Sequence, residues 1–134
     1  MDELAKRLAD AGAALATLDE AVAMTGRSII ERDGALLRLV YSFETIWQSC
    51  QQLLADREEI TTRTANQTIQ AAHRLGWLSD GETEAIIKIL HDRNLVAHSY
   101  RDEIGNEIEG RLGVHAVMLR RWLEVLQERA GALK

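Results

Sequence analysis

The chain has 134 residues, of which 46% are hydrophobic, and this is enough to build one core. We therefore expect a single domain over residues 1–134. The net charge of -5 at pH 7 argues against indiscriminate nucleic-acid binding, so any RNA contact would need a local basic groove. Proline is absent, which permits long uninterrupted helices and predicts an all-α fold.

Cysteine content and hydropathy indicate the compartment. Cys50 is the only cysteine, so no intramolecular disulfide can form and a reducing compartment is expected. It lies in an apolar run, which predicts a buried structural thiol. Asp2 and Glu3 open the chain and no long charge-free apolar stretch follows, which argues against a signal peptide or a membrane span. We expect a cytoplasmic protein that does not associate with a membrane.

Apolar residues spaced three and four apart predict a first helix from about residue 2 to residue 24. After a break at 25–28, Ser28 and Glu31 form a capping-box pattern that predicts the start of a second helix. That helix is apolar over most of its circumference, so we expect it to be the central helix of a bundle. Its apolar residues are Ile30, Leu36, Leu37, Val40, Phe43, Trp47, Cys50, Leu53 and Leu54.

Three further helices follow from the same spacing. The third runs from about residue 64 to 75 and ends at Gly76, and the fourth starts after a cap at Ser79 or Asp80 and runs toward Arg93. The last runs from about residue 103 to 130, with a spacing that suits bundle packing or a dimer seam. The chain therefore predicts an up-and-down helical bundle of about five helices.

Glu44 is a carboxylate among the apolar positions of the second helix. An unpaired carboxylate is costly to bury, so we expect it to have a cationic partner. Arg93 or another arginine would serve, and a supporting role in orienting that arginine is the preferred interpretation.

The chemistry of the chain concentrates in Arg93, Asn94, His98 and Tyr100. Arginine can bond two phosphate oxygens at once and stays charged while negative charge builds up in a transition state. Histidine can take a proton from a ribose 2′-hydroxyl or return one to the leaving oxygen. These two roles suffice for RNA cleavage without a metal. Residues five apart converge only if the helix bends or ends between them, and the region of Tyr100 is a place for that end.

Structural explanations exist for each of these residues. An arginine or a histidine near a helix C-terminus often serves to interact with the helix dipole, and a tyrosine at a helix junction often packs or donates one hydrogen bond. His91, Asp92, His98 and His115 lack compact metal-ligand spacing, so we expect no metal and no cofactor.

Other charged and titratable side chains give weaker signals. His73 and His115 lie among apolar neighbours and are expected in the core or at an interface. Arg101 and Arg111 are candidates for a local positive groove, although several nearby carboxylates, Asp102 among them, would weaken it.

The motif resembles that of HEPN-domain proteins. In these proteins an arginine is followed by a polar residue and then a histidine, as in Arg93, Asn94 and His98, and in HepT-like members a tyrosine follows, as Tyr100 does here. Phe43-Glu44 followed by Trp47 is similar to the second-helix signature of related nucleotidyltransferase substrate-binding proteins. The resemblance covers roughly residues 30 to 130.

The resemblance implies a toxin of a toxin–antitoxin pair. Such a protein is a homodimer in which two Arg–His motifs form one RNA-cleaving groove, with Arg93 and His98 catalytic and Asn94 supporting. It also implies a cognate minimal nucleotidyltransferase as antitoxin, which in some pairs silences the nuclease by AMPylation at the position of Tyr100. A non-catalytic subunit that binds the nucleotidyltransferase's substrate is the alternative, and a purely structural dimeric bundle is the third hypothesis.

Overall fold

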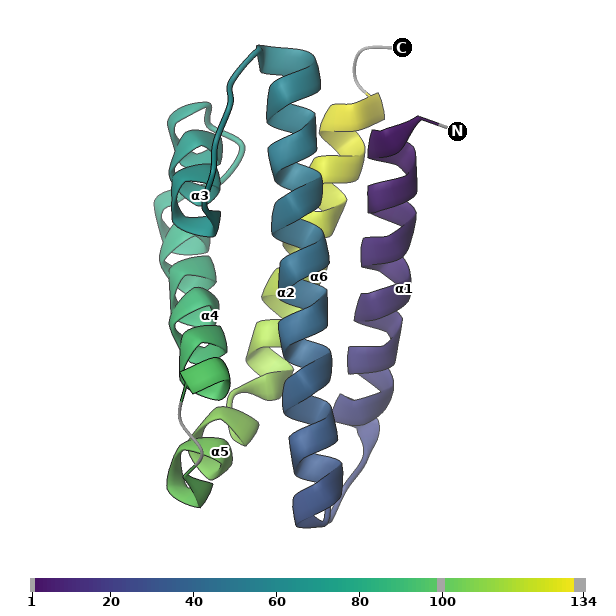
Figure 1. The fold of residues 1–134 in the computed structure, drawn as a ribbon, viewed down its shortest axis with the longest axis vertical. Helices are drawn as coiled ribbons and strands as arrows, with labels where there is room; N and C mark the ends of the chain where they lie inside the picture. The colour runs from purple at the N-terminus through teal and green to yellow at the C-terminus, as the bar shows by residue number, and fades with distance from the viewer. Residues whose placement is uncertain (1, 99–100, 132–134) are drawn as a thin grey trace.

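The computed structural model describes residues 2–98 and 101–131, and within them six helices form an up-and-down bundle (Figure 1). The helices are α1 (Glu3–Ala23), α2 (Ile29–Glu58), α3 (Ala65–Arg74), α4 (Asp80–His98), α5 (Asp102–Glu109) and α6 (Leu112–Gly131). In Figure 1, α1 lies on one side of α2, α3 and α4 lie on the other side, and α6 lies behind. The predicted all-α bundle is confirmed.

The helix α2 is the centre of the bundle, as its composition predicts. It contacts α1, α3, α4, α5 and α6, and its residues Leu39, Phe43, Ile46 and Leu53 are completely buried. The sequence pattern was misleading at the N-terminal end of α2. Ile30 is 84% exposed and Leu37 is 46% exposed, because none of the described helices packs over their side of α2.

The predicted helix starts and stops are largely confirmed. At the start of α2, Glu31 N donates to Ser28 Oγ at 3.1 Å and Ser28 N donates to Glu31 Oε1 at 2.9 Å, which completes the capping box. Past the end of α3, Gly76 has a φ of +77°, a conformation that favours glycine. Ser79 caps α4 in the same reciprocal way with Glu82.

Two helix boundaries differ from the sequence prediction. Helix α4 does not stop near Arg93 but continues to His98, because Leu95 and Val96 still pack against the core. The predicted helix over residues 103–130 is divided into α5 and α6 at residues 110–111. Glycines lower helix propensity in this segment, and at the break Arg111 N donates to Ile108 O at 2.8 Å, a tighter turn than that of an α-helix.

The environment of Cys50 agrees with the expectation from composition. Cys50 is buried, and burial raises the pKa of its thiol to about 12, so the predicted structural thiol is confirmed. Among the residues described, none of the helices combines the length and the apolar character needed to cross a bilayer.

Candidate functional site

Arg93 is held in place by residues of α2. Its Nε lies 2.7 Å from Glu44 Oε1, although the N–H does not point along this line, so the contact is an ion pair rather than an aligned hydrogen bond. Its Cζ lies 5.4 Å from the centroid of the Phe43 ring, within range of a cation–π interaction. The side chain of Arg93 is 23% exposed, so the guanidinium is positioned by the core and still reaches solvent.

The second-helix signature therefore surrounds the motif arginine. Trp47 Nε1 donates to Glu44 Oε2 at 3.0 Å, while the other oxygen of the same carboxylate contacts Arg93. A further contact comes from α4 itself, where Arg93 Nη1 donates to Asn94 Oδ1 at 2.8 Å. The expected Glu44–Arg93 pair is thus present, and the carboxylate and the amide engage different nitrogens of the same guanidinium.

His98 lies apart from Arg93 within one chain. It is the last residue of α4 and is exposed. Since α4 is continuous between the two residues, five positions place them about 140° apart around the helix and about 7.5 Å apart along it. The bend or end that would bring them together does not occur between them. Tyr100, the expected modification site, lies outside the described residues, as does Ser99.

A buried polar cluster next to Arg93 was not recognised from the sequence. The carboxylate of Asp92, which is 1% exposed, accepts two hydrogen bonds from Arg111, from Nε at 2.8 Å and from Nη2 at 2.9 Å. His115 Nε2 lies 2.6 Å from Asp92 Oδ2. Burial raises the pKa of Asp92, but the hydrogen bonds from Arg111 and His115 outweigh it, and the pKa lies below its usual value.

This cluster connects α4 to the start of α6. The break between α5 and α6 places Arg111 and His115 where both reach Asp92, and His115 is buried, as expected for a core histidine. The signal in the sequence was the glycine-rich segment around residue 110, because a helix broken there changes which residues face α4. The cluster fixes the backbone immediately before Arg93.

The positive groove expected from Arg101 and Arg111 is weak in the structure. Arg111 is neutralised by Asp92, and Arg101 Nε lies 3.6 Å from Glu103 Oε2. In the part of the chain that the structure describes, no three histidine, cysteine, aspartate or glutamate side chains are grouped as metal ligands.

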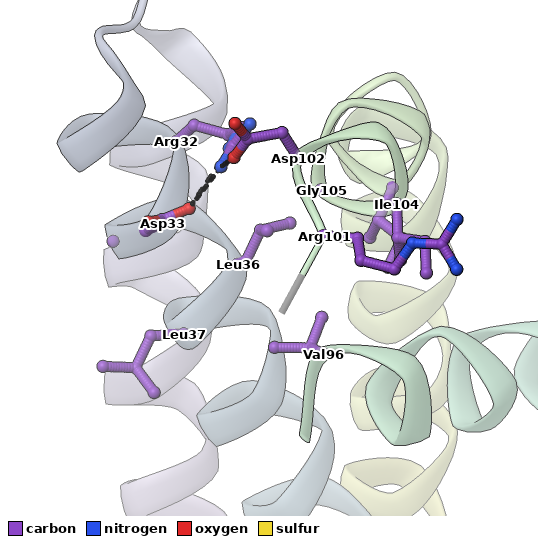
Figure 2. A pocket seen from close by; sticks show the side chains of 11 residues that line it. Arg32, Asp33, Leu36, Leu37, Val96, Arg101, Asp102, Ile104 and Gly105 are labelled. Atoms are coloured by element: carbon purple, nitrogen blue, oxygen red, sulfur yellow. Dashed lines mark hydrogen bonds and ion pairs between the residues drawn. The ribbon is translucent and has the colours of Figure 1, made fainter. Parts of the chain in front are cut away.

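A cavity of about 420 Å³ lies where α2, the end of α4 and α5 meet (Figure 2). Leu36 and Val96 line it, and Arg32 and Asp102 meet at one end of it. The buried Arg32 donates to Asp33, Asp102 and Asn106, so the polar end of the cavity is satisfied by internal hydrogen bonds. Sequence reasoning missed Arg32, because its partners on α5 are about 70 residues away.

Similarity to known proteins was found at two levels. The family described as nucleotidyltransferase substrate binding protein like matches residues 6–128. A solved structure of a protein from Thermus thermophilus is 32% identical, with a TM-score of 0.81, and the match covers 87% of this chain and 98% of that one.

More distant solved structures share the fold. One is a tri-AMPylated HEPN toxin from Shewanella oneidensis in complex with its MNT antitoxin, which is 11% identical with a TM-score of 0.77 over 95% of this chain and 98% of that one. Another is a toxin–antitoxin complex with AMP-PNP, also 11% identical with a TM-score of 0.77, over 94% of this chain and 99% of that one. No curated protein matches the chain. Because the family model spans nearly the whole sequence, the chain belongs to the nucleotidyltransferase substrate binding protein like family.

Proposed function

We propose that this protein is a HEPN-type toxin, a metal-independent endoribonuclease that acts in the cytoplasm as a homodimer. The observation that carries the proposal is the fixed Arg93, held by Glu44 and Asn94 with part of its guanidinium open to solvent. A charged group that is already oriented stabilises a transition state without further reorganisation. The exposed His98 follows on the same helix.

The two side chains divide the reaction between them. His98 removes the proton of a ribose 2′-hydroxyl, whose oxygen attacks the adjacent phosphorus. Arg93 stabilises the charge on the phosphate oxygens as the bond to the 5′-oxygen breaks, and a protonated histidine returns a proton to that leaving oxygen. The products are a 2′,3′-cyclic phosphate and a free 5′-hydroxyl. Because Arg93 and His98 diverge within one chain, the second protomer of the homodimer supplies the complementary side chain.

The proposed antitoxin is a cognate minimal nucleotidyltransferase. One structure with the same fold is that of a tri-AMPylated HEPN toxin in complex with an MNT antitoxin. In this chain Tyr100 takes the AMP: its phenolic oxygen attacks the α-phosphate of ATP, and pyrophosphate leaves. The modification adds a negatively charged phosphodiester two residues from His98, which weakens RNA binding at the same groove.

The test is cleavage of an unstructured RNA by the purified, partner-free protein in the presence of a chelator. We expect the wild type to cut and His98→Ala to lose at least about 100-fold in rate, the range of general acid–base catalysis. His91→Ala is the matched control, because His91 is also exposed on α4, and it should cut as the wild type does. Equal cleavage by His98→Ala and the wild type would contradict the proposed role of His98.

A non-catalytic role is the second candidate function. The family description names a substrate-binding protein, and Glu44 neutralises much of the charge of Arg93. In that case neither the wild type nor the variants would cut RNA. The protein would instead raise the affinity of its nucleotidyltransferase for the substrate, and Arg93→Ala would abolish the effect.

A further inference from the structure

An apolar stripe on α2 is left uncovered by the bundle. Ile30, Leu37 and Tyr41 are 84%, 46% and 52% exposed, and Gly34 lies between the first two. Their spacing of four, three and four residues places all of them on one face of the helix, over about 16 Å. These exposed fractions show that the bundle does not cover this face of α2.

Exposure of this kind differs from a single solvent-facing leucine. Scattered apolar residues are normal on a protein surface, whereas an ordered row of large ones at heptad-like spacing is the pattern of a helix–helix seam. The buried residues of α2 already pack within the core of the bundle, so the stripe is a second apolar face of the same helix.

We infer that this stripe packs against the same stripe of a second copy, with the two α2 helices antiparallel about a two-fold axis. The spacing of four, three and four reads the same in both directions, as an interface made of identical surfaces requires. In this register Ile30 lies opposite the partner's Tyr41, and Leu37 lies opposite the partner's Gly34. A Cβ added at Gly34 would meet no atom within 4 Å, so this position leaves a gap in the face of the helix. The seam therefore pairs Ile30 with Tyr41, which are both large, and sets Leu37 over the gap at Gly34.

The charges beside the stripe fit the same register. Glu31 and Arg38 are both exposed and are seven residues apart, so they lie along the same edge of the stripe. A two-fold axis perpendicular to the helices brings equal edges together and places Glu31 and the partner's Arg38 on the same edge, offset by about 3 Å along the helices, in each of the two symmetric positions. Within the described residues Arg38 forms no ion pair of its own.

This seam would also place the candidate sites of the two protomers close to the two-fold axis of the dimer. Leu37 and Val96 line the same cavity, so the end of α4 lies level with the centre of the stripe. Each protomer would then present its His98 near the same two-fold axis. This inference rests on the homodimer of the proposed function and is independent of whether the protein cleaves RNA.

The first test measures the mass of the whole chain in solution by sedimentation at micromolar concentration. The wild type should sediment as twice 15.0 kDa, and Leu37→Asp, which buries a charge in the seam, should sediment as 15.0 kDa. Val117→Asp is the matched control, because Val117 is an exposed apolar residue on α6, 72% exposed and outside the stripe. It should remain a dimer. A monomeric wild type or a dimeric Leu37→Asp would overturn the inference.

The second test fixes the register by cross-linking. Ile30→Cys and Tyr41→Cys chains should form a disulfide dimer under mild oxidation only when the two are mixed, because equal positions are about 16 Å apart in an antiparallel seam. The buried Cys50 does not interfere. Cross-linking of either variant with itself, or none in the mixture, would contradict the register.

The two proposals separate in these experiments. If the wild type is a dimer that Leu37→Asp dissociates, and it does not cut RNA, the proposed seam stands and the proposed nuclease activity is rejected. If the wild type is a monomer that cuts RNA, the proposed seam is rejected and the proposed nuclease activity stands.

Discussion

Arg93 illustrates how neighbouring side chains set the geometry of a single functional group. Glu44 joins Arg93 and Trp47, so one carboxylate orders two side chains of different helices. The cost is partial neutralisation of the charge that would bind phosphate. In the proposed function, the ion pair lowers the affinity of Arg93 for phosphate but fixes the orientation of its guanidinium. A fixed orientation matters more to a transition state than to a ground state.

The substitution Glu44→Gln tests this role. It keeps the shape of the side chain but removes its charge, so Arg93 becomes free to leave its fixed position. We expect RNA cleavage to fall on the order of tenfold, with a change in the free energy of unfolding below about 1 kcal/mol because the pair is partly exposed. Glu58→Gln, an exposed position at the end of α2, should change neither quantity. Unchanged cleavage by Glu44→Gln would show that Glu44 does not orient Arg93.

Asp92 should contribute to stability in a pH-dependent way. Asp92→Asn leaves Arg111 and His115 without their carboxylate and should lower the free energy of unfolding by about 3 kcal/mol at pH 7. The folded-state pKa of Asp92 lies below its unfolded value, so this stabilisation is complete above the unfolded pKa and is lost as the pH falls through the folded pKa.

Urea unfolding from pH 7 downward measures this effect. The difference between the wild type and Asp92→Asn should shrink steadily as the pH falls below about 4. Asp19→Asn, which removes an exposed ion pair with Arg120, should cost less than about 1 kcal/mol and serves as the control. A difference that stays constant into acid would mean that the charge of Asp92 is not what stabilises the fold.

At the level of elements, the short helix α5 is fastened to α2 by a close approach at Gly105. A Cβ added there would lie 3.0 Å from Arg32 Cζ, while that guanidinium is fixed by Asp102 and Asn106. Gly105→Ala should therefore displace Arg32 and lower the free energy of unfolding by about 1 kcal/mol. Gly12→Ala in α1 meets nothing within 4 Å and should instead raise it by about 0.5–1 kcal/mol.

Thermal or urea unfolding of these two alanine variants gives a direct comparison, since both replace a helical glycine. Opposite signs are expected. Stabilisation of similar size in both would mean that Arg32 gives way easily and that α5 does not depend on it.

The bundle as a whole explains how an acidic protein can present a local cation. The net charge of -5 is spread over the surface, and the carboxylates nearest the motif are engaged with arginines, as in Glu44 with Arg93 and Asp92 with Arg111. The field at the proposed site therefore depends on which arginine nitrogens remain open to solvent, and not on the total charge.

Local patterns in the sequence determined the elements. The absence of proline, the three-and-four spacing, the Ser28 and Glu31 capping box and Gly76 are properties of a few neighbouring residues, so they could be read without the fold. The cost of burying a carboxylate likewise allowed a cationic partner to be predicted for Glu44, with Arg93 as a candidate.

The tertiary structure alone decided what depends on distant segments. It showed that α4 continues through the motif, that α5 and α6 are separate, and that Asp92 meets Arg111 and His115. It also left Ile30 and Leu37 exposed, although their pattern is that of core residues. The physical reason is that an apolar face specifies burial but not its partner, which only the packing of the helices selects.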